Sequence, residues 1–176
     1  MDFLSDVLAD GRRLKTLNIV DDATRECPVI EADTSISGQR VARVLDHVGL
    51  IWGLPKRIVV DNGPEFTSKA PDQWAYRNGV ELVFIRPGRP VENCFIESFN
   101  GKFRDECLNL HWFKDLEDAR QTIEEWRHEY NHFRPHSSLG GKTPSEFAEQ
   151  SGLRPTPSSS VLIAPKPGLS EDLPTC

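Results

Sequence analysis

The chain has 176 residues, of which 38% are hydrophobic and 27% charged, and its formal net charge at pH 7 is −6. This length fits one domain and excludes two domains of standard size. No window reaches the ~18–20 consecutive apolar residues of a membrane span, and Asp2 and Asp6 replace the basic start of a signal peptide. We therefore expect a cytoplasmic protein with no membrane partner. Four cysteines without a CxxC pair indicate reduced thiols, and the acidic balance alone argues against a nucleic-acid partner.

The first half of the chain alternates strand-like and helix-like patterns. Short β-branched runs predict strands, and apolar residues at helical spacing predict helices. The predicted strands cover residues 1–8, 14–20, 27–31, 57–60 and 80–85, and the predicted helices cover about 41–52 and 67–78. The order βββαβαβ predicts an α/β domain.

The second half is predicted to be helical, with a different composition at its end. After an Arg-Pro-Gly-Arg-Pro loop at 86–90, helices are expected at about 92–108 and 116–132. The aromatic residues of the latter region could stack on bases, but their spacing favours core packing; they are Trp112, Phe113, Trp126 and Tyr130. From Ser151 onward Pro, Ser and Gly dominate, so we divide the chain into a core, 1–149, and a disordered tail, 150–176.

Three acids are distinguished by their positions. Asp2 lies in the first strand, Asp61 directly follows an apolar strand, and Glu97 lies on the helix after the Pro/Gly loop, with residues 62–96 between the last two. Ligands and catalytic groups of α/β sheets gather at such strand ends. For Asp61, which precedes Asn62 and Gly63, a plain turn is an equally good interpretation.

The helix that carries Glu97 has two contrasting faces. At 100° per residue, a stripe roughly 60° wide is polar, and three phenylalanines occupy the opposite side. The polar stripe consists of Asn93, Glu97, Asn100 and Arg104, and the apolar side of Phe95, Phe99 and Phe103. A solvated helix face remains the alternative, although such a face carries Lys and Glu more often than Asn.

At these residues the sequence resembles the integrase-type catalytic core of bacterial insertion-sequence transposases. This group is encoded in two overlapping reading frames (OrfB-type) and is related to retroviral integrases. The resemblance extends from Met1 to about Glu149 and includes a basic residue, Arg104, seven positions after Glu97. The matching segments are 2–3, 20–26, 60–66, 96–102, 130–131 and the Arg-Pro-His-Ser-Ser-Leu sequence at 134–139.

The resemblance implies a fold and a reaction. The fold is an α/β, ribonuclease H-like mixed five-stranded sheet flanked by helices, with its first strand truncated in this chain. The family's DDE triad carries over onto Asp2, Asp61 and Glu97, which would hold two Mg²⁺ ions, with Mn²⁺ as a substitute. Two such ions suit in-line displacement at phosphodiesters, and Mg²⁺ prefers oxygen ligands. The implied activity is a Mg²⁺-dependent polynucleotidyl transferase that nicks DNA and joins 3′-hydroxyl ends.

The resemblance also suggests further site residues and partners. The side chains expected to contact DNA are Arg89, Asn93, Asn100, Lys102 and Arg104, and those expected to support the acids are Asn62 and Glu65. The implied partners are transposon-end and target DNA, which would place the protein at the nucleoid, and further copies of the chain or a full-length transposase. Positive charge from Arg86, Arg89, Lys102 and Arg104 would lie near the phosphates and offset the acidic balance.

The position of Asp2 raises two alternatives to an active core. Relatives usually carry a Trp-containing strand segment and a helix-turn-helix before the first acid, so we expect a fragment or a decayed copy that binds DNA weakly and with strong salt sensitivity. The first alternative is a catalytically silent remnant that binds DNA or a full-length transposase. The second, a host nuclease of ribonuclease H type, is disfavoured by the 134–139 sequence.

Overall fold

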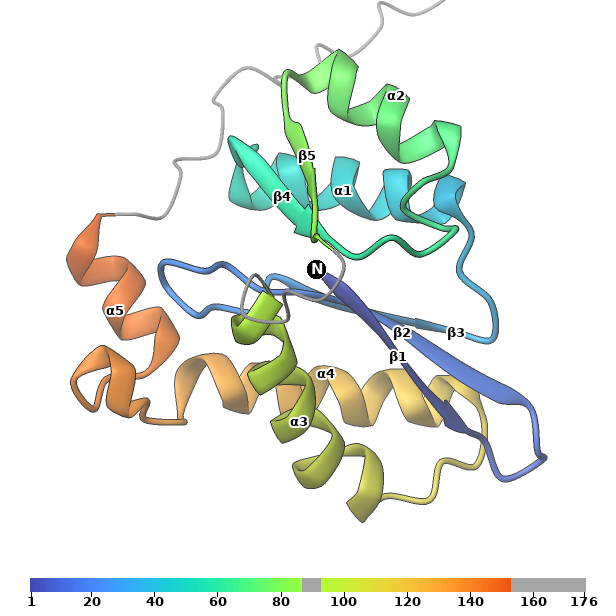
Figure 1. The fold of residues 1–176 in the computed structure, drawn as a ribbon. Coiled ribbons are helices and arrows are strands. Elements are labelled where there is room, and N and C mark those ends of the chain that lie inside the picture. Colours follow the sequence, from blue (N-terminus) through green and yellow to red (C-terminus); the bar gives the residue numbers. More distant parts are fainter. Residues whose placement is uncertain (87–92, 153–176) are drawn as a thin grey trace, which may run out of the picture.

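A computed structural model describes residues 1–86 and 93–152 of the chain. An antiparallel meander comes first, followed by alternating helices and strands and then by a helical half (Figure 1). The strands are β1 (Asp2–Val7), β2 (Arg13–Ile19), β3 (Val29–Asp33), β4 (Arg57–Val60) and β5 (Glu81–Phe84). The α-helices are α1 (Gly38–Trp52), α2 (Lys69–Asn78), α3 (Cys94–Glu106), α4 (Leu116–His132) and α5 (Pro144–Ser151). None of the helices in this described part combines the length and hydropathy of a membrane span.

The described strands form two sheets, which corrects the expectation of one continuous five-stranded sheet. β1, β2 and β3 pair in that order, with Asp2 opposite Asn18 and Val7 opposite Arg13, while β4 and β5 form a separate parallel pair. The two sheets approach each other where β1 begins. There the ammonium group of Met1 donates to the carbonyl oxygen of Val59 at 2.7 Å. Among the described strands, no ladder joins β1 to β4.

The three-stranded sheet separates two apolar cores (Figure 1). Alternate residues of a strand face opposite sides, so Leu14 and Leu17 of β2 enter different cores. The α3–α4 core includes Phe99, Phe103, Phe113, Ile123, Trp126 and Tyr130, and the α1–α2 core includes Met1, Val41, Val60, Phe66 and Trp74. Core packing is thus confirmed for three of the four aromatic residues that could have stacked on bases, whereas Trp112 is 82% exposed.

Side chains of α4 contact the main chain of β3 and of Cys27, which lies just before it. Arg120 donates from Nε to the carbonyl oxygen of Ala32 at 3.0 Å, and Arg127 donates from Nη1 to that of Cys27 at 2.8 Å. The side chain of Asn131 accepts from the Cys27 N–H at 2.8 Å and donates to the Cys27 carbonyl oxygen at 2.9 Å. Because Asn131 takes both main-chain groups of Cys27, β3 begins at Val29, two residues later than predicted.

Helix α5 was not predicted, although its start carries a complete capping box. The Thr143 hydroxyl accepts from the Glu146 N–H at 3.2 Å, and the Glu146 carboxylate accepts from the Thr143 N–H at 2.9 Å. Pro144 occupies the first turn, where its missing N–H costs nothing. The helix runs to Ser151, and the rest of the predicted tail, 153–176, lies outside the described residues.

Candidate active site

Asp2 is fixed at the start of β1 by hydrogen bonds to both of its carboxylate oxygens. Oδ1 accepts from the Phe3 N–H at 2.7 Å, and Oδ2 accepts from Nδ2 of Asn100 at 2.8 Å. The second bond spans 98 positions in sequence and connects β1 with α3. The orientation of this half-buried carboxylate is therefore set by both the sheet and the helix.

Asp61 follows directly after the last residue of β4, and its carboxylate shapes the turn there. Oδ1 accepts from the Gly63 N–H at 2.9 Å, which is an Asx turn. A Cβ atom at Gly63 would lie 2.9 Å from the same oxygen, so this turn requires the small residue. The Asp61-Asn62-Gly63 segment is thus a turn, as the plain interpretation held, and it also holds a carboxylate in a set direction.

The structure brings Asp2 and Asp61 together. Burial raises the pKa of Asp2, and the nearby negative charge of Asp61 raises that pKa further. The hydrogen bonds from Phe3 and Asn100 oppose this rise because they favour the ionised carboxylate. Two carboxylates that repel each other at neighbouring strand ends form a place where a cation would be stabilised.

Asn100 connects α3 to two strands. Besides donating to Asp2, its Oδ1 accepts from Nδ2 of Asn18 at 2.7 Å, and both asparagines are buried. Asn18 lies opposite Asp2 in the β1–β2 register. Sequence reasoning missed Asn18, although an asparagine between Leu17 and Ile19 in a buried strand is the signal that could have identified it. Asn100, predicted to contact DNA, has a positioning role in this structure.

Glu97 lies one helical turn before Asn100 and is exposed. Residues three apart share a face of a helix, so Glu97 is on the side of α3 that reaches Asp2. Within residues 1–86 and 93–152, however, no three His, Cys, Asp or Glu side chains are close enough together to hold a metal ion. The structure therefore places Asp2 and Asp61 close together, and Glu97 lies exposed on α3, the helix that Asn100 joins to Asp2.

The donors at this site fit a hard divalent cation. Mg²⁺ is held in proteins by one or two carboxylates together with water and substrate phosphates, so it does not need a cage made entirely of protein ligands. Asp2 and Asp61 supply such a pair, and a cation between them would relieve their repulsion.

The remaining side chains predicted to contact DNA are dispersed. Arg89 lies outside the described residues, and Asn93 is buried at the start of α3. Lys102 is half-buried, and its pKa is lowered first by burial and then by the charge of Arg134. Arg104 donates from Nη2 to the carbonyl oxygen of Ser5 at 3.3 Å, along β1 and away from its first residue. Two residues of the polar stripe, Asn100 and Arg104, thus attach α3 to β1.

Asn62 and Glu65, predicted to support the acids, brace the loop that follows β4. Asn62 donates from Nδ2 to the carbonyl oxygen of Ile85 at 3.0 Å, beyond the end of β5. Glu65 forms an ion pair with Lys15 of β2, and the hydrogen bond from Lys15 lowers the pKa of Glu65. These contacts fix the loop that follows Asp61 to the chain after β5 and to β2.

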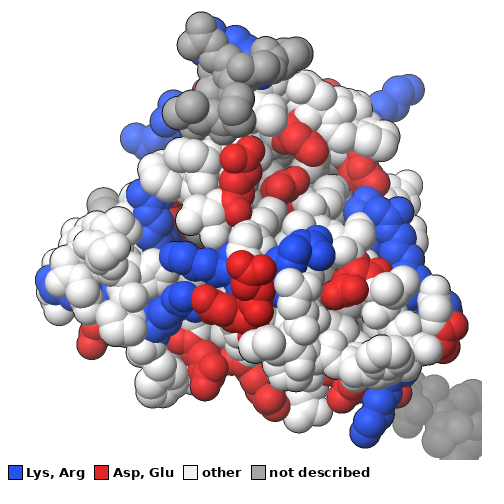
Figure 2. Space-filling view, turned by 60° about the horizontal axis from the view of Figure 1, so that its bottom comes forward, with Lys and Arg blue, Asp and Glu red and all other residues white. Residues whose placement is uncertain are grey.

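The charges around the helical half are mixed in sign. On the face shown in Figure 2, Lys and Arg side chains stand among Asp and Glu side chains and form no broad basic patch. Such a surface gives little general attraction to a phosphate backbone.

Comparison with protein families identifies two matching regions. A model of the integrase core domain matches residues 1–90, and a second model with the same description matches residues 78–144. Together they cover the sheets and the helices through the start of α5.

Two bacterial relatives are similar over most of this chain. An uncharacterized 31.7 kDa protein of insertion element IS407 from Burkholderia multivorans is 56% identical over 148 residues, which are 84% of this chain and 53% of the relative. An uncharacterized 39.2 kDa protein of insertion element IS476 from Xanthomonas euvesicatoria is 53% identical over 148 residues, 84% of this chain and 43% of the relative. The chain thus spans about half the length of these relatives.

Two solved structures share the fold. One is a simian T-cell lymphotropic virus intasome in complex with the PP2A regulatory subunit B56 gamma, with a TM-score of 0.65, 15% identity, and coverage of 99% of this chain and 60% of that one. The other is the HTLV-2 integrase catalytic core domain in complex with magnesium, in a trimeric form, with a TM-score of 0.58, 17% identity, and coverage of 83% of this chain and 94% of that one. The α/β fold is therefore that of retroviral integrase catalytic cores.

Proposed function

The chain belongs to the integrase core domain family, and from this premise we propose that it is the catalytic core of a DDE transposase. In this proposal it nicks DNA and joins 3′-hydroxyl ends to a target in a reaction that depends on Mg²⁺ or Mn²⁺. The observation that carries the proposal is the Asp2–Asp61 pair, held at adjacent strand ends with α3 fastened to Asp2 through Asn100.

Different hydrogen bonds orient Asp2 and Asp61, and this orientation determines what each carboxylate would do. Asp61, oriented by the Gly63 N–H, and Asp2, oriented by Asn100, would hold divalent cations, and Glu97 would contribute from α3. When bound, two Mg²⁺ ions supply an activated attacking oxygen and charge stabilisation at the leaving oxygen. The protein's part is to hold two carboxylates close together in fixed orientations, since no protein nucleophile is needed.

We propose DNA and further copies of the chain as partners. The intermixed surface charges suggest that this core binds DNA weakly and that binding falls steeply with salt. Transposon ends and target DNA are the substrates that fit the proposed reaction. Full-length transposase or a second copy would be needed to join two ends at once.

Nicking of supercoiled plasmid DNA in the presence of Mn²⁺ or Mg²⁺ tests the proposal. We expect Asp61→Asn and Glu97→Gln each to lower the rate by about a hundredfold or more, as expected for loss of a group that stabilises transition-state charge. The matched controls, Asp72→Asn and Glu125→Gln, change exposed acids on α2 and α4 and should keep the wild-type rate. If both site variants nick DNA as fast as the wild type, the assignment of the acids is wrong.

A second candidate function is a catalytically silent remnant that binds DNA or a full-length transposase and modulates it. One observation favours it: in the described part of the chain, no cluster of three possible metal ligands is assembled. Thermal unfolding with and without MgCl₂ separates the two functions. An active core should be stabilised by Mg²⁺ and should lose this response in Asp61→Asn, whereas a silent remnant should show no Mg²⁺ response and no nicking.

A further inference from the structure

The turn that follows β2 holds one residue in a strained backbone conformation. Arg25 has a φ of 64° and is the one residue other than glycine with a positive φ in the described part of the chain. The carbonyl oxygen of Asp21 accepts from the Arg25 N–H at 2.8 Å. Oδ1 of Asp21 accepts from the N–H groups of Ala23 and Thr24 at 2.7 and 2.9 Å. Strain that neighbouring contacts maintain in this way is typical of functional segments.

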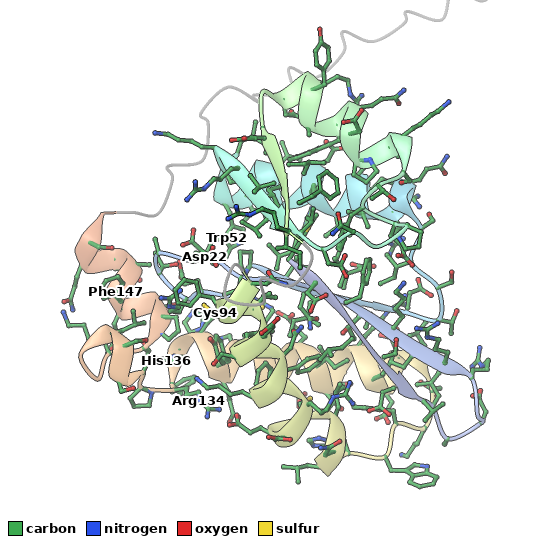
Figure 3. All side chains as sticks on the ribbon, in the orientation of Figure 1. Asp22, Trp52, Cys94, Arg134, His136 and Phe147 are labelled. Atoms are coloured by element: carbon green, nitrogen blue, oxygen red, sulfur yellow. The ribbon has the colours of Figure 1, made fainter. Side chains whose placement is uncertain are left out.

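The side chain of Arg25 lies over the first turn of α3. Its guanidinium carbon is 3.5 Å from the centre of the Phe95 ring, and its Nη1 donates to the carbonyl oxygen of Asp22 at 2.5 Å. In Figure 3 Asp22, which marks the turn after β2, lies next to Cys94, the first residue of α3. A cation over an aromatic face is attracted by the negative charge of the ring face. The contact therefore attaches the start of α3 to the turn after β2.

The N-cap position gives the first turn of α3 no side-chain support. Asn93 stands at this position, but its side chain makes no capping hydrogen bond. Ile96 packs into the α3–α4 core, whereas Phe95 is 44% exposed, so the contact with Arg25 holds the flank of the turn that carries Phe95. Loss of the Arg25 side chain would therefore release this flank.

We propose that Arg25 is a positioning residue for Glu97. Glu97 lies two residues after Phe95 and three before Asn100, which donates to Asp2. The contacts of Phe95 and Asn100 thus hold α3 on both sides of Glu97. Arg25 touches none of the reacting groups and acts only through the Phe95 ring. The inference rests on the proposed function, in which Glu97 contributes to holding a divalent cation.

The variant Arg25→Gly separates the side chain of Arg25 from its strained backbone. Glycine adopts a positive φ freely, so this variant relieves the strain while it removes the contact with Phe95. We expect a thermal unfolding midpoint close to that of the wild type. Hydrogen exchange should be at least about threefold faster at the amide of Phe99, whose helical acceptor is the Phe95 carbonyl oxygen. Half-maximal nicking should require about ten times more Mn²⁺, because Glu97 is less well placed.

Two further arginine variants serve as references in the full chain. Arg25→Lys keeps a cation that can lie over the Phe95 ring, so it should recover most of the loss in exchange protection and in Mn²⁺ requirement. Arg43→Leu removes an exposed arginine of α1 and should behave as the wild type in both measurements. A merely structural role for Arg25 would change the unfolding midpoint and leave the Mn²⁺ requirement unchanged.

A double variant tests whether Arg25 acts through Phe95. Phe95→Leu removes the ring, so adding it to Arg25→Gly should change neither measurement further, because both substitutions remove the same contact. Additive effects would overturn the proposal, and so would an unchanged Mn²⁺ requirement in Arg25→Gly when the wild type nicks DNA. If the wild type does not nick DNA, the proposed function fails. Exchange at Phe99 then decides whether Arg25 holds the start of α3, and an unchanged exchange rate in Arg25→Gly would overturn that role.

Discussion

The α3–α4 core and the α1–α2 core lie on opposite faces of one sheet but are attached to it by different interactions. On the α3–α4 side, polar side chains reach main-chain or buried polar groups of the strands, as with Asn100 to Asp2, Arg104 to Ser5 and Arg120 to Ala32. On the α1–α2 side, the polar contacts with the strands are ion pairs between side chains, Arg40 with Glu31 and Lys15 with Glu65, and they accompany apolar packing.

Several contacts on the α1–α2 side meet where the first strands approach β4 and the loop after it. Phe3 of β1 stacks on Phe66 with ring centroids 4.9 Å apart, and the Lys15 ammonium lies 4.1 Å from the centre of the Phe3 ring. The Lys15–Glu65 ion pair and the Met1–Val59 hydrogen bond complete the junction. Asp2 thus belongs to the hydrogen-bonded side and Asp61 to the packed side. Their mutual placement therefore depends on how firmly the two sides stay together.

Among the variants that test this contrast between the two sides, Phe66→Ala is expected to lower stability the most. Phe66 is fully buried and joins β1 to the loop after β4, so its removal leaves a cavity and should lower the free energy of unfolding by about 3–5 kcal/mol. Urea unfolding followed by tryptophan fluorescence measures this change. Phe133→Ala, at a side chain that is 71% exposed, is the matched control and should cost less than about 0.5 kcal/mol. Equal losses in the two variants would show that packing does not hold the junction.

A fall in pH is expected to lower the stability of the α3–α4 side through His136. Burial, together with the charges of Lys102, Arg134 and Arg25, lowers the pKa of His136 to about 4 from the ordinary value of 6.5. Between these two pH values the unfolded chain binds a proton that the folded chain does not. Stability is therefore full above pH 6.5 and falls toward pH 4, by an amount on the order of 3 kcal/mol.

His136→Phe tests this acid sensitivity, because it keeps a ring against Tyr130 and removes the titrating group. Urea unfolding at pH 7, 5.5 and 4 should give a flatter profile for the variant than for the wild type. The control is His128→Gln, which changes an exposed histidine of α4. If the wild-type and His136→Phe profiles remain parallel, His136 does not cause the acid sensitivity.

A smaller effect is expected from Asn100→Leu, which sharpens the contrast between the two sides. The variant removes the donor to Asp2 and leaves the Asn18 amide without its acceptor, at a cost of about 1–3 kcal/mol. If the proposed function holds, nicking should also fall while Asp61 keeps its turn. Asn109→Leu, at an exposed position, is the control for both readouts. An unchanged nicking rate in a stably folded Asn100→Leu protein would contradict a positioning role.

Local sequence patterns predicted most of the elements, because strand and helix periodicities are local properties. β2, α1, β4 and α4 lie within a few residues of their predicted bounds. The start of β3 could not be derived in this way, since it depends on Asn131, more than a hundred positions away. α5 differs, because its capping box at Thr143 and Glu146 is a local signal that is visible in the sequence.

The site was partly predictable for the same reason. The motif around Asp61 carries its own turn, so its local geometry follows from Asp61 and Gly63 alone. The role of Asn100 depends on contacts with Asp2 and Asn18, which lie 98 and 82 positions away. A helical stripe shows which residues share a face, but it does not show whether that face meets solvent, DNA or the sheet. The division of the strands into two sheets also depends on tertiary structure, because the pairing of distant strands is not a local property.

The contacts between α4 and the β3 edge of the sheet affect the risk of aggregation during folding. β3 ends the three-stranded sheet, and an uncovered terminal strand is a template for intermolecular pairing and aggregation. Arg120 occupies a carbonyl oxygen of β3, and Arg127 and Asn131 occupy main-chain groups of Cys27 just before it, so α4 protects this edge against self-association. Because the ribosome synthesises α4 long after β3, this edge of the sheet stays uncovered until α4 has been made. The interval before α4 docks is the period in which a nascent chain is most exposed to misassembly and has the greatest need of a chaperone.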